Sequence, residues 1–415
     1  MNGSVKGRFG FGAAAALVAA IAGCATARTE TPPAARAPGA PAEAGPRGAA
    51  RDPASLVAVA DQVAGAIPVN PHARDRAMMQ EEAVKGWIAL GDLERAEVGM
   101  RRIGDWRRGE ATALVAQARA SRGEIDAARS LAAEARELAG REEDWRRDRI
   151  GAEVARTLAM TGDLGQIDGL VDPAAAAEAG NVAAAVTAVV PAERLEAQAK
   201  VFDDAIATGA FELVRGGLDG YLAIMRRADC DDAWRARATK ALDGALPGLP
   251  YDLRVLYLVT LADALTARGR NDEARAALDR ADGEIAAAGF LAEDIVPIGA
   301  PVAVARTRLG DRDAARAALR SLRATFENRR EEVVNLRRAT SWRALASAFM
   351  GLGDRADAEA CFAAALEDGA LNPNARPRAE DLCLTLLSMA RCGFAPTDSM
   401  DRRIDAIRAG LADPW

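Results

Sequence analysis

Residues 342–365, WRALASAFMGLGDRADAEACFAAA, hold two segments with periodic apolar residues on either side of a Gly-Asp turn. In the first segment Trp342, Leu345 and Phe349 recur at three- and four-residue spacing, which is the period of one face of an α-helix. The same spacing resumes after Gly353 and continues to residue 365. Alanine, leucine, arginine and glutamate, which are strong helix formers, are abundant in the chain from residue 54 onward. The stretch therefore predicts two helices joined by a tight turn.

Turns of this kind recur along the chain. In four of six, an Asp follows the glycine, which predicts a helix N-cap. Neighbouring turn glycines lie 32, 39, 41 and 43 residues apart, with one gap of 107 residues. That gap has room for two or three degenerate repeats near 181–249, one of which we expect to turn at Gly209. The six turn glycines are Gly91, Gly123, Gly162, Gly269, Gly310 and Gly353.

Small residues keep a constant distance from these turns. An alanine lies seven residues before most turn glycines, at Ala116, Ala155, Ala262, Ala303 and Ala346. Another lies five residues after most of them, at Ala96, Ala128, Ala274, Ala315 and Ala358. Because a small side chain lets two helices approach closely, we expect the two helices of each unit to cross at these alanines.

This arrangement resembles the tetratricopeptide repeat, a helix–turn–helix unit of about 34 residues. The best match is the set Trp342, Leu345, Ala346, Phe349, Gly353, Ala358, Phe362 and Ala365, followed a few residues late by Pro373. The resemblance implies an all-α fold in which residues 54–415 form TPR-like repeats stacked into a right-handed α-solenoid of roughly nine helix pairs. Since most units are longer than the family's, a related α-solenoid is the alternative.

The same resemblance implies a concave surface lined by the first helix of each unit. A protein or peptide partner would bind there, whereas the simpler interpretation is a set of solvated helix faces. The positions that the resemblance places in this groove are Glu81, Glu82, Lys85, Gln117, Arg149, Glu153, Arg156, Asp263, Arg308 and Arg343.

The N-terminus has the pattern of an export signal. Lys6 and Arg8 precede an apolar stretch from residue 13 to residue 22, which is too short to span a bilayer. The stretch ends in Ile21-Ala22-Gly23-Cys24 and resembles the lipobox of bacterial lipoproteins. The resemblance implies a signal peptide at 1–23 and acyl chains, palmitate among them, on Cys24; an ordinary secretory signal is the alternative. Ala25 after the cysteine implies an outer-membrane location facing the periplasm.

Residues 24–53 would then be the lipidated cysteine and a tether. Six prolines stand among Ala, Gly, Thr and Arg in residues 25–53, and no helical or strand periodicity is present. Proline-rich composition favours an extended, semi-rigid chain. We expect this segment to hold the helical part away from the membrane.

Composition excludes several classes of function. The chain has 415 residues, 54 Lys and Arg, 60 Asp and Glu, one His and a net charge of −6, so it lacks the basic footprint of a nucleic-acid binder. No P-loop or serine-nucleophile motif occurs, and the glycines at 216–220 fail the dinucleotide fingerprint. His72 has no metal-ligand pattern around it. We therefore expect no enzyme, no cofactor and no metal.

Two further side-chain types leave open questions. Cys361 and Cys383 lie symmetrically about Asn372, so an exported chain could join them in a disulfide, or both could be small buried thiols. Five tryptophans occupy helical positions suited to packing, and we expect them in the core: Trp87, Trp106, Trp145, Trp234 and Trp342.

The expected function follows from location and shape. The sequence predicts a lipid-anchored scaffold or adaptor of the bacterial envelope, binding an unidentified protein or peptide. A glycan- or small-ligand-binding surface lipoprotein is the alternative, and it would require exposed aromatic residues clustered on one surface.

Overall fold

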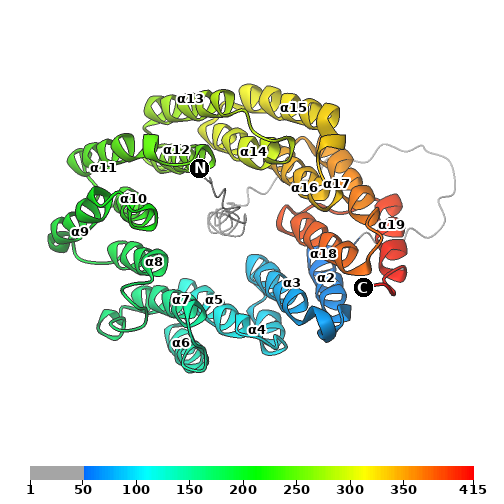
Figure 1. Cartoon of the computed structure of the whole chain (residues 1–415), viewed down its shortest axis with the longest axis horizontal. Helices are drawn as coiled ribbons and strands as arrows, with labels where there is room; N and C mark the ends of the chain where they lie inside the picture. Colours follow the sequence, from blue (N-terminus) through cyan, green and yellow to red (C-terminus); the bar gives the residue numbers. More distant parts are fainter. Residues whose placement is uncertain (1–50) are drawn as a thin grey trace, which may run out of the picture. The chain divides into compact units, whose positions relative to one another are not determined.

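The computed structural model describes residues 51–415, and every regular element in this range is a helix. Eighteen α-helices pack in antiparallel pairs, joined in places by short 3-10 helices (Figure 1). The all-α fold predicted from the sequence is confirmed. The signal peptide, Cys24 and the tether up to residue 50 lie outside the described residues. Within residues 51–415 no helix has the length and apolar character needed to cross a membrane.

Nine helices, here called A helices, form one series in which each packs against the next. They are α3 (Val69–Leu90), α5 (Arg107–Ser121), α7 (Trp145–Thr161), α8 (Ala176–Thr187), α10 (Phe211–Arg226), α12 (Tyr251–Thr266), α14 (Ala292–Leu309), α16 (Asn335–Leu352) and α18 (Ala375–Arg391).

Eight other helices, here called B helices, each pack against one or two A helices. They are α2 (Pro53–Ala66), α4 (Leu93–Arg101), α6 (Ile125–Ala139), α9 (Leu195–Ala207), α11 (Asp232–Ala245), α13 (Asn271–Ala288), α15 (Arg312–Arg329) and α17 (Arg355–Ala370). The last helix, α19 (Asp398–Ala409), contacts α17 and α18.

The predicted turn glycines all adopt the left-handed backbone conformation. Their φ angles lie between 70° and 94°, a region that costs an L-residue energy but suits glycine at the end of a helix. Each of these glycines follows an A helix. The alanines predicted at the helix crossings are also confirmed as core residues, because all ten are at most 1% exposed.

The aspartates after these glycines differ from expectation. Only Asp92 caps its helix, by accepting a hydrogen bond from the backbone N–H of Arg95 at 3.1 Å. The carboxylates of the other three instead accept hydrogen bonds from the guanidinium of an arginine on the preceding B helix. The pairs are Arg129–Asp163 at 2.7 Å, Arg275–Asp311 at 3.0 Å and Arg316–Asp354 at 2.6 Å. An ion pair between consecutive repeats therefore replaces the expected cap.

The degenerate region also departs from the expected register. Gly209 does have a positive φ of 67°, but it joins B helix α9 to A helix α10, whereas the other turn glycines join A to B. After α7, a 3-10 helix and a loop stand where a B helix would be. α8 and α10 approach closely at two glycines, because a Cβ on Gly180 would lie 2.7 Å from the Cα of Gly216. Larger side chains there would force the two A helices apart.

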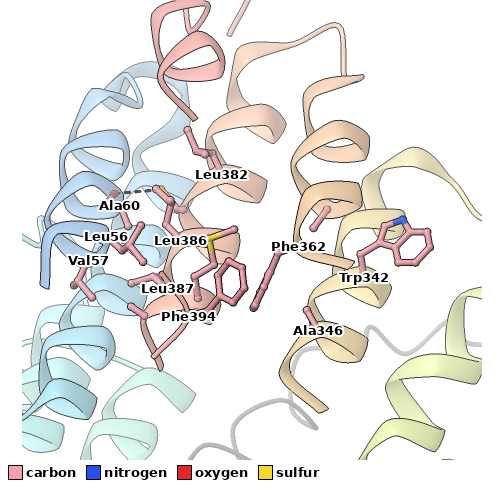
Figure 2. Packing of buried hydrophobic residues seen from close by; sticks show 14 of the residues in the cluster. Leu56, Val57, Ala60, Trp342, Ala346, Phe362, Leu382, Leu386, Leu387 and Phe394 are labelled. Carbon is pink, nitrogen blue, oxygen red and sulfur yellow. Dashed lines mark hydrogen bonds between the residues drawn. The ribbon is translucent and has the colours of Figure 1, made fainter. Parts of the chain in front are cut away.

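The series of A helices closes on itself, which the sequence did not predict. α18 packs against both α2 and α3 at the start of the described chain, so α2 occupies the position of the B helix that follows α18 (Figure 2). Leu56 and Val57 of α2 are fully buried with Leu386 and Leu387 of α18 in one hydrophobic cluster. The Cys383 thiol donates a hydrogen bond to the carbonyl of Ala60 at 3.2 Å.

Charged pairs reinforce this junction. Arg391 at the end of α18 bonds Glu82 of α3 at 3.0 Å, and Arg51 before α2 bonds Asp401 of α19 at 3.1 Å. A glycine permits the close contact, because a Cβ on Gly86 would lie 2.7 Å from a methyl group of Leu387. The two ends of the described chain thus share one core.

We predict that Leu56→Ala loosens this junction before the rest of the protein. Removing a fully buried leucine costs about 2–5 kcal/mol, because it leaves a cavity as well as losing apolar contact. Hydrogen exchange should show protection lost first in α2, α3 and α18, although α18 lies more than 300 residues away in sequence. Leu278→Ala, an equally buried change in α13, is the control and should affect α12 and α13 instead. Unchanged protection of α18 in Leu56→Ala would contradict the closure.

Candidate binding surface on the A helices

All ten residues predicted to line a groove lie on A helices. Three belong to α3, one to α5, three to α7, and one each to α12, α14 and α16. Their side chains do not stand alone, because nearly all form ion pairs or hydrogen bonds, most of them with an adjacent A helix. The structure brings them together in three groups, at α3–α5–α7, α12–α14 and α16–α18.

The first group begins with a triad on α3. Lys85 bonds Glu81 at 2.7 Å and Glu82 at 3.0 Å. Glu81 also faces Arg107 at the start of α5, at 3.5 Å. Since the Glu81 carboxylate is almost fully buried, the two basic groups offset only part of the cost of its charge.

The same group continues across α5 and α7. Arg149 of α7 reaches back to the buried Glu110 of α5 at 3.1 Å. Gln117 of α5 donates to the Glu153 carboxylate at 2.8 Å, and Arg156 pairs with that carboxylate at 3.2 Å. Seven of the ten predicted residues therefore form one continuous polar strip over three consecutive A helices.

Burial separates the two acids on α3. Burial, together with the nearby Glu110 carboxylate, raises the pKa of Glu81 to about 7, against a usual value of 4.5. Burial acts in the same direction on Glu82, but Lys85 and Arg391 outweigh it and leave its pKa below the usual value. The Glu81 carboxyl therefore titrates near neutral pH.

The second group joins α12 and α14. Arg308 bonds one oxygen of Asp263 at 2.6 Å, while the other oxygen of that carboxylate is buried and has no hydrogen-bond partner. Arg226 of α10 lies near Asp263 and Asp219 without a hydrogen bond to either. Desolvation lowers the pKa of Arg226, although both carboxylates act in the opposite direction. One oxygen of Asp263 and the guanidinium of Arg226 are therefore incompletely paired by other side chains in this group.

The third group lies inside the packing between α16 and α18. Arg343 pairs with Asp381 at 2.8 Å, and both side chains are about 10% exposed. Burial raises the pKa of Asp381 even though Arg343 opposes this shift. Arg343 was expected to face a groove, but helix packing encloses it, so it is among the least accessible of the ten residues.

The sequence did not identify the partners Arg107, Glu110 and Asp381. A signal for two of these pairs was nevertheless present, since each partner stands about one repeat away from the residue it binds. The separations are 39 residues for Arg149 and Glu110 and 38 residues for Arg343 and Asp381. A search for opposite charges one repeat apart could have found them.

Among the tryptophans, the prediction of core packing is confirmed for Trp87 and Trp342, which are buried. Trp342 also donates its indole N–H to Asp368 at 2.7 Å. Trp106 and Trp145 meet edge to face with ring centroids 5.1 Å apart, but Trp145 is 53% exposed. The prediction is wrong for Trp145, because its position at the first residue of α7 leaves one face of the indole uncovered.

The structure also places the histidine and the two cysteines noted in the sequence. His72 lies 3.5 Å from Asp75 at the start of α3. Cys361 and Cys383 are buried free thiols, and burial raises the pKa of Cys361 to about 12. Nowhere in residues 51–415 do three or more His, Cys, Asp or Glu side chains gather as a metal site would require.

The fold and this surface define a broad class, an all-helical protein of packed antiparallel helix pairs whose A helices carry a polar strip. No family model matches the chain, and no match was found among curated proteins or solved structures. The arrangement of its own residues is therefore the basis for assigning a function.

We predict that Glu81 makes stability fall as pH rises. Its pKa is higher in the folded chain than in the unfolded chain, so the stabilisation is present below about pH 4.5 and lost by about pH 7. The shift from 4.5 to about 7 corresponds to about 3 kcal/mol at most. Urea unfolding between pH 4.5 and pH 8 should show this slope.

Glu81→Gln should flatten that slope, because the amide does not titrate. Glu367→Gln is the control, since that carboxylate is 63% exposed on α17 and pairs only with Arg403. A slope that survives in Glu81→Gln would assign the proton to another group.

Proposed function

We propose that residues 54–415 form a right-handed, TPR-like α-solenoid that acts as a lipid-anchored scaffold or adaptor of the bacterial envelope. In this proposal a protein or peptide partner binds along the A helices. The observation that carries the proposal is the polar strip over α3, α5 and α7, in which side chains from consecutive repeats meet in register. A repeated, aligned set of side chains suits a ligand that is itself a repeating chain.

The exposed fractions of the acidic and basic side chains indicate the kind of partner. In each of four pairs the acid is less exposed than the base, and in three of them the acid is buried. Lys85 is 30% exposed against 7% for Glu81, and Arg149 is 34% exposed against 8% for Glu110. The pairs Arg156–Glu153 and Arg308–Asp263 repeat this difference.

A ligand approaching the A helices would therefore meet guanidinium and ammonium groups first. Guanidinium groups bind carboxylates with directional hydrogen bonds, which favours a partner segment rich in Asp and Glu. The whole chain is acidic, so this local excess of exposed basic groups does not follow from composition.

The alternative function, binding of a glycan or a small ligand, has one observation in its favour. Trp145 exposes its indole beside Trp106, and a flat apolar ring suits a sugar face. This aromatic pair stands at the starts of α5 and α7 and borders one end of the polar strip, where the guanidinium carbon of Arg107 lies 4.7 Å from the Trp106 ring centroid. It is a single pair, whereas the polar strip extends over three A helices. We therefore keep the polar strip as the proposed site and assign no catalytic step to it.

A photo-crosslinking residue at position 156 tests the proposed site. In living cells it should give a discrete protein adduct, because Arg156 lies on the strip and is 39% exposed. The matched position is 240, since Lys240 is exposed on B helix α11. Adding Arg149→Ala and Arg308→Ala should reduce the adduct at least about tenfold, the effect of losing one charged hydrogen bond or more. Equal adducts from both positions would refute a specific site.

The anchor is tested separately with Cys24→Ser. The proposal predicts that this change abolishes incorporation of labelled palmitate, because the thiol takes up the diacylglyceryl group that carries the acyl chains, and that it releases the protein from the membrane fraction. Two acyl chains make attachment effectively permanent, so the difference should be close to complete. Cys392→Ser, on a thiol outside the N-terminal segment, is the control. Labelling that persists in Cys24→Ser would show that Cys24 is not the anchor.

A further inference from the structure

Exposed large apolar side chains gather at one kind of position, the start of an A helix. Of the twelve that residues 51–415 expose, eight lie within four residues of an A-helix start. The eight are Val69, Trp145, Phe211, Tyr251, Leu291, Val334, Leu336 and Leu371. Scattered exposed apolar residues need no explanation, but a recurrence at one position of successive repeats does.

These positions share one edge because neighbouring A helices run parallel. Arg376, near the start of α18, faces Asp75 near the start of α3 at 3.7 Å. At the other end, Arg227 after α10 donates to the carbonyl of Thr187 at the end of α8, at 2.7 Å. The starts of the A helices therefore lie together, and we call this edge the start edge.

Arginine side chains stack on aromatic rings of the start edge. The guanidinium carbon lies 5.8 Å from the ring centroid in Arg146–Trp145 and 5.8 Å in Arg215–Phe211. It lies 4.5 Å from the ring centroid in Arg254–Tyr251. Aromatic rings prefer the boundary between headgroups and acyl chains, and arginines there can bind lipid phosphates.

The opposite edge has a different character. B helices begin there, and their first turns carry fully exposed acids at Asp126, Asp272 and Asp313. Glu94 on α4 and Asp232 on α11 are also strongly exposed. Exposed acids also occur at the start edge, where Glu331 is 80% and Glu332 56% exposed just before Val334. The two edges therefore differ in their exposed apolar side chains and not in the presence of exposed acids.

We propose that the start edge is a lipid-contacting surface that inserts its exposed apolar side chains into the headgroup region of a phospholipid bilayer. This goes beyond the proposed acyl anchor, because it concerns residues 51–415 and not Cys24. The A helices would then stand upright on the membrane, with the edge where the B helices begin facing away from it. Binding strength should scale with the apolar area inserted and with the attraction of arginines to anionic lipid.

Vesicles of phosphatidylethanolamine and phosphatidylglycerol at a ratio of about three to one test this proposal. The full chain, made by cell-free synthesis so that no acyl group is added, is mixed with vesicles that carry a doxyl quencher near the headgroups. Residues 1–50 contain no tryptophan, so their own binding to lipid adds no fluorescence signal. The Trp145 signal is the difference between the unchanged chain and Trp145→Phe. We expect quenching of this signal in the vesicle-bound protein.

A matched pair of variants locates the contact. Val69→Ser, Leu291→Ser, Leu336→Ser and Leu371→Ser together should reduce Trp145 quenching at least about tenfold, because insertion depends on apolar area. Val98→Ser with Val201→Ser is the control, since these side chains are equally exposed but lie on B helices, and quenching should be unchanged.

Three results would overturn the proposal. The first is a chain that does not bind vesicles, and the second is a bound chain whose Trp145 is not quenched. The third is equal loss of quenching in the edge and control variants. An alternative result is a dimer in sedimentation that persists in the presence of lipid but is absent in the four-serine edge variant. In that case the start edge contacts a second copy of the chain and not a bilayer.

Discussion

The packing of α2 against α18 is the contact that joins the two ends of the helical series. In a series of helix pairs each unit buries its apolar face only against its neighbours, so the first and last units are left with uncovered faces. Here α2 covers α18 and α3 together, and Leu56, Val57, Leu386 and Leu387 become fully buried. The same contact brings Glu82 within reach of Arg391 and so completes the charge balance of the triad on α3.

The local features of this fold could be predicted from sequence, while the long-range ones could not. A turn glycine needs a positive φ, and an alanine at a helix crossing needs a small volume, so both leave a fixed residue type at a fixed spacing. The closure leaves no such pattern, because Ala60 and Cys383 are 323 residues apart and either could belong to any buried helix face. The same reasoning applies to Gly209. The glycine correctly predicted a turn, but it did not show that this turn joins a B helix to the following A helix.

The candidate site shows the same limit at the level of side chains. The resemblance to the tetratricopeptide repeat supplied all ten predicted residues, and all lie on A helices, but it could not distinguish an exposed Arg156 from an enclosed Arg343. Burial also sets the chemistry. It makes Glu81 a carboxyl that titrates near neutral pH, while Glu82 beside it stays ionised through Lys85 and Arg391. Neither difference is visible in a one-dimensional charge pattern, because both depend on how deeply a neighbouring helix covers the group.

The closure also gives the chain an unusual order of assembly. Among the helices of residues 51–415, α2 is made first, yet its partner α18 follows more than 300 residues later, so its apolar face has only α3 to contact until α18 is made. Bringing together residues 323 apart costs about 2 kcal/mol more in chain entropy than joining neighbours about 40 apart. A truncated product that ends before α18 would leave Leu56 and Val57 uncovered. Such a product would expose to chaperones and proteases an apolar surface that the full-length protein conceals.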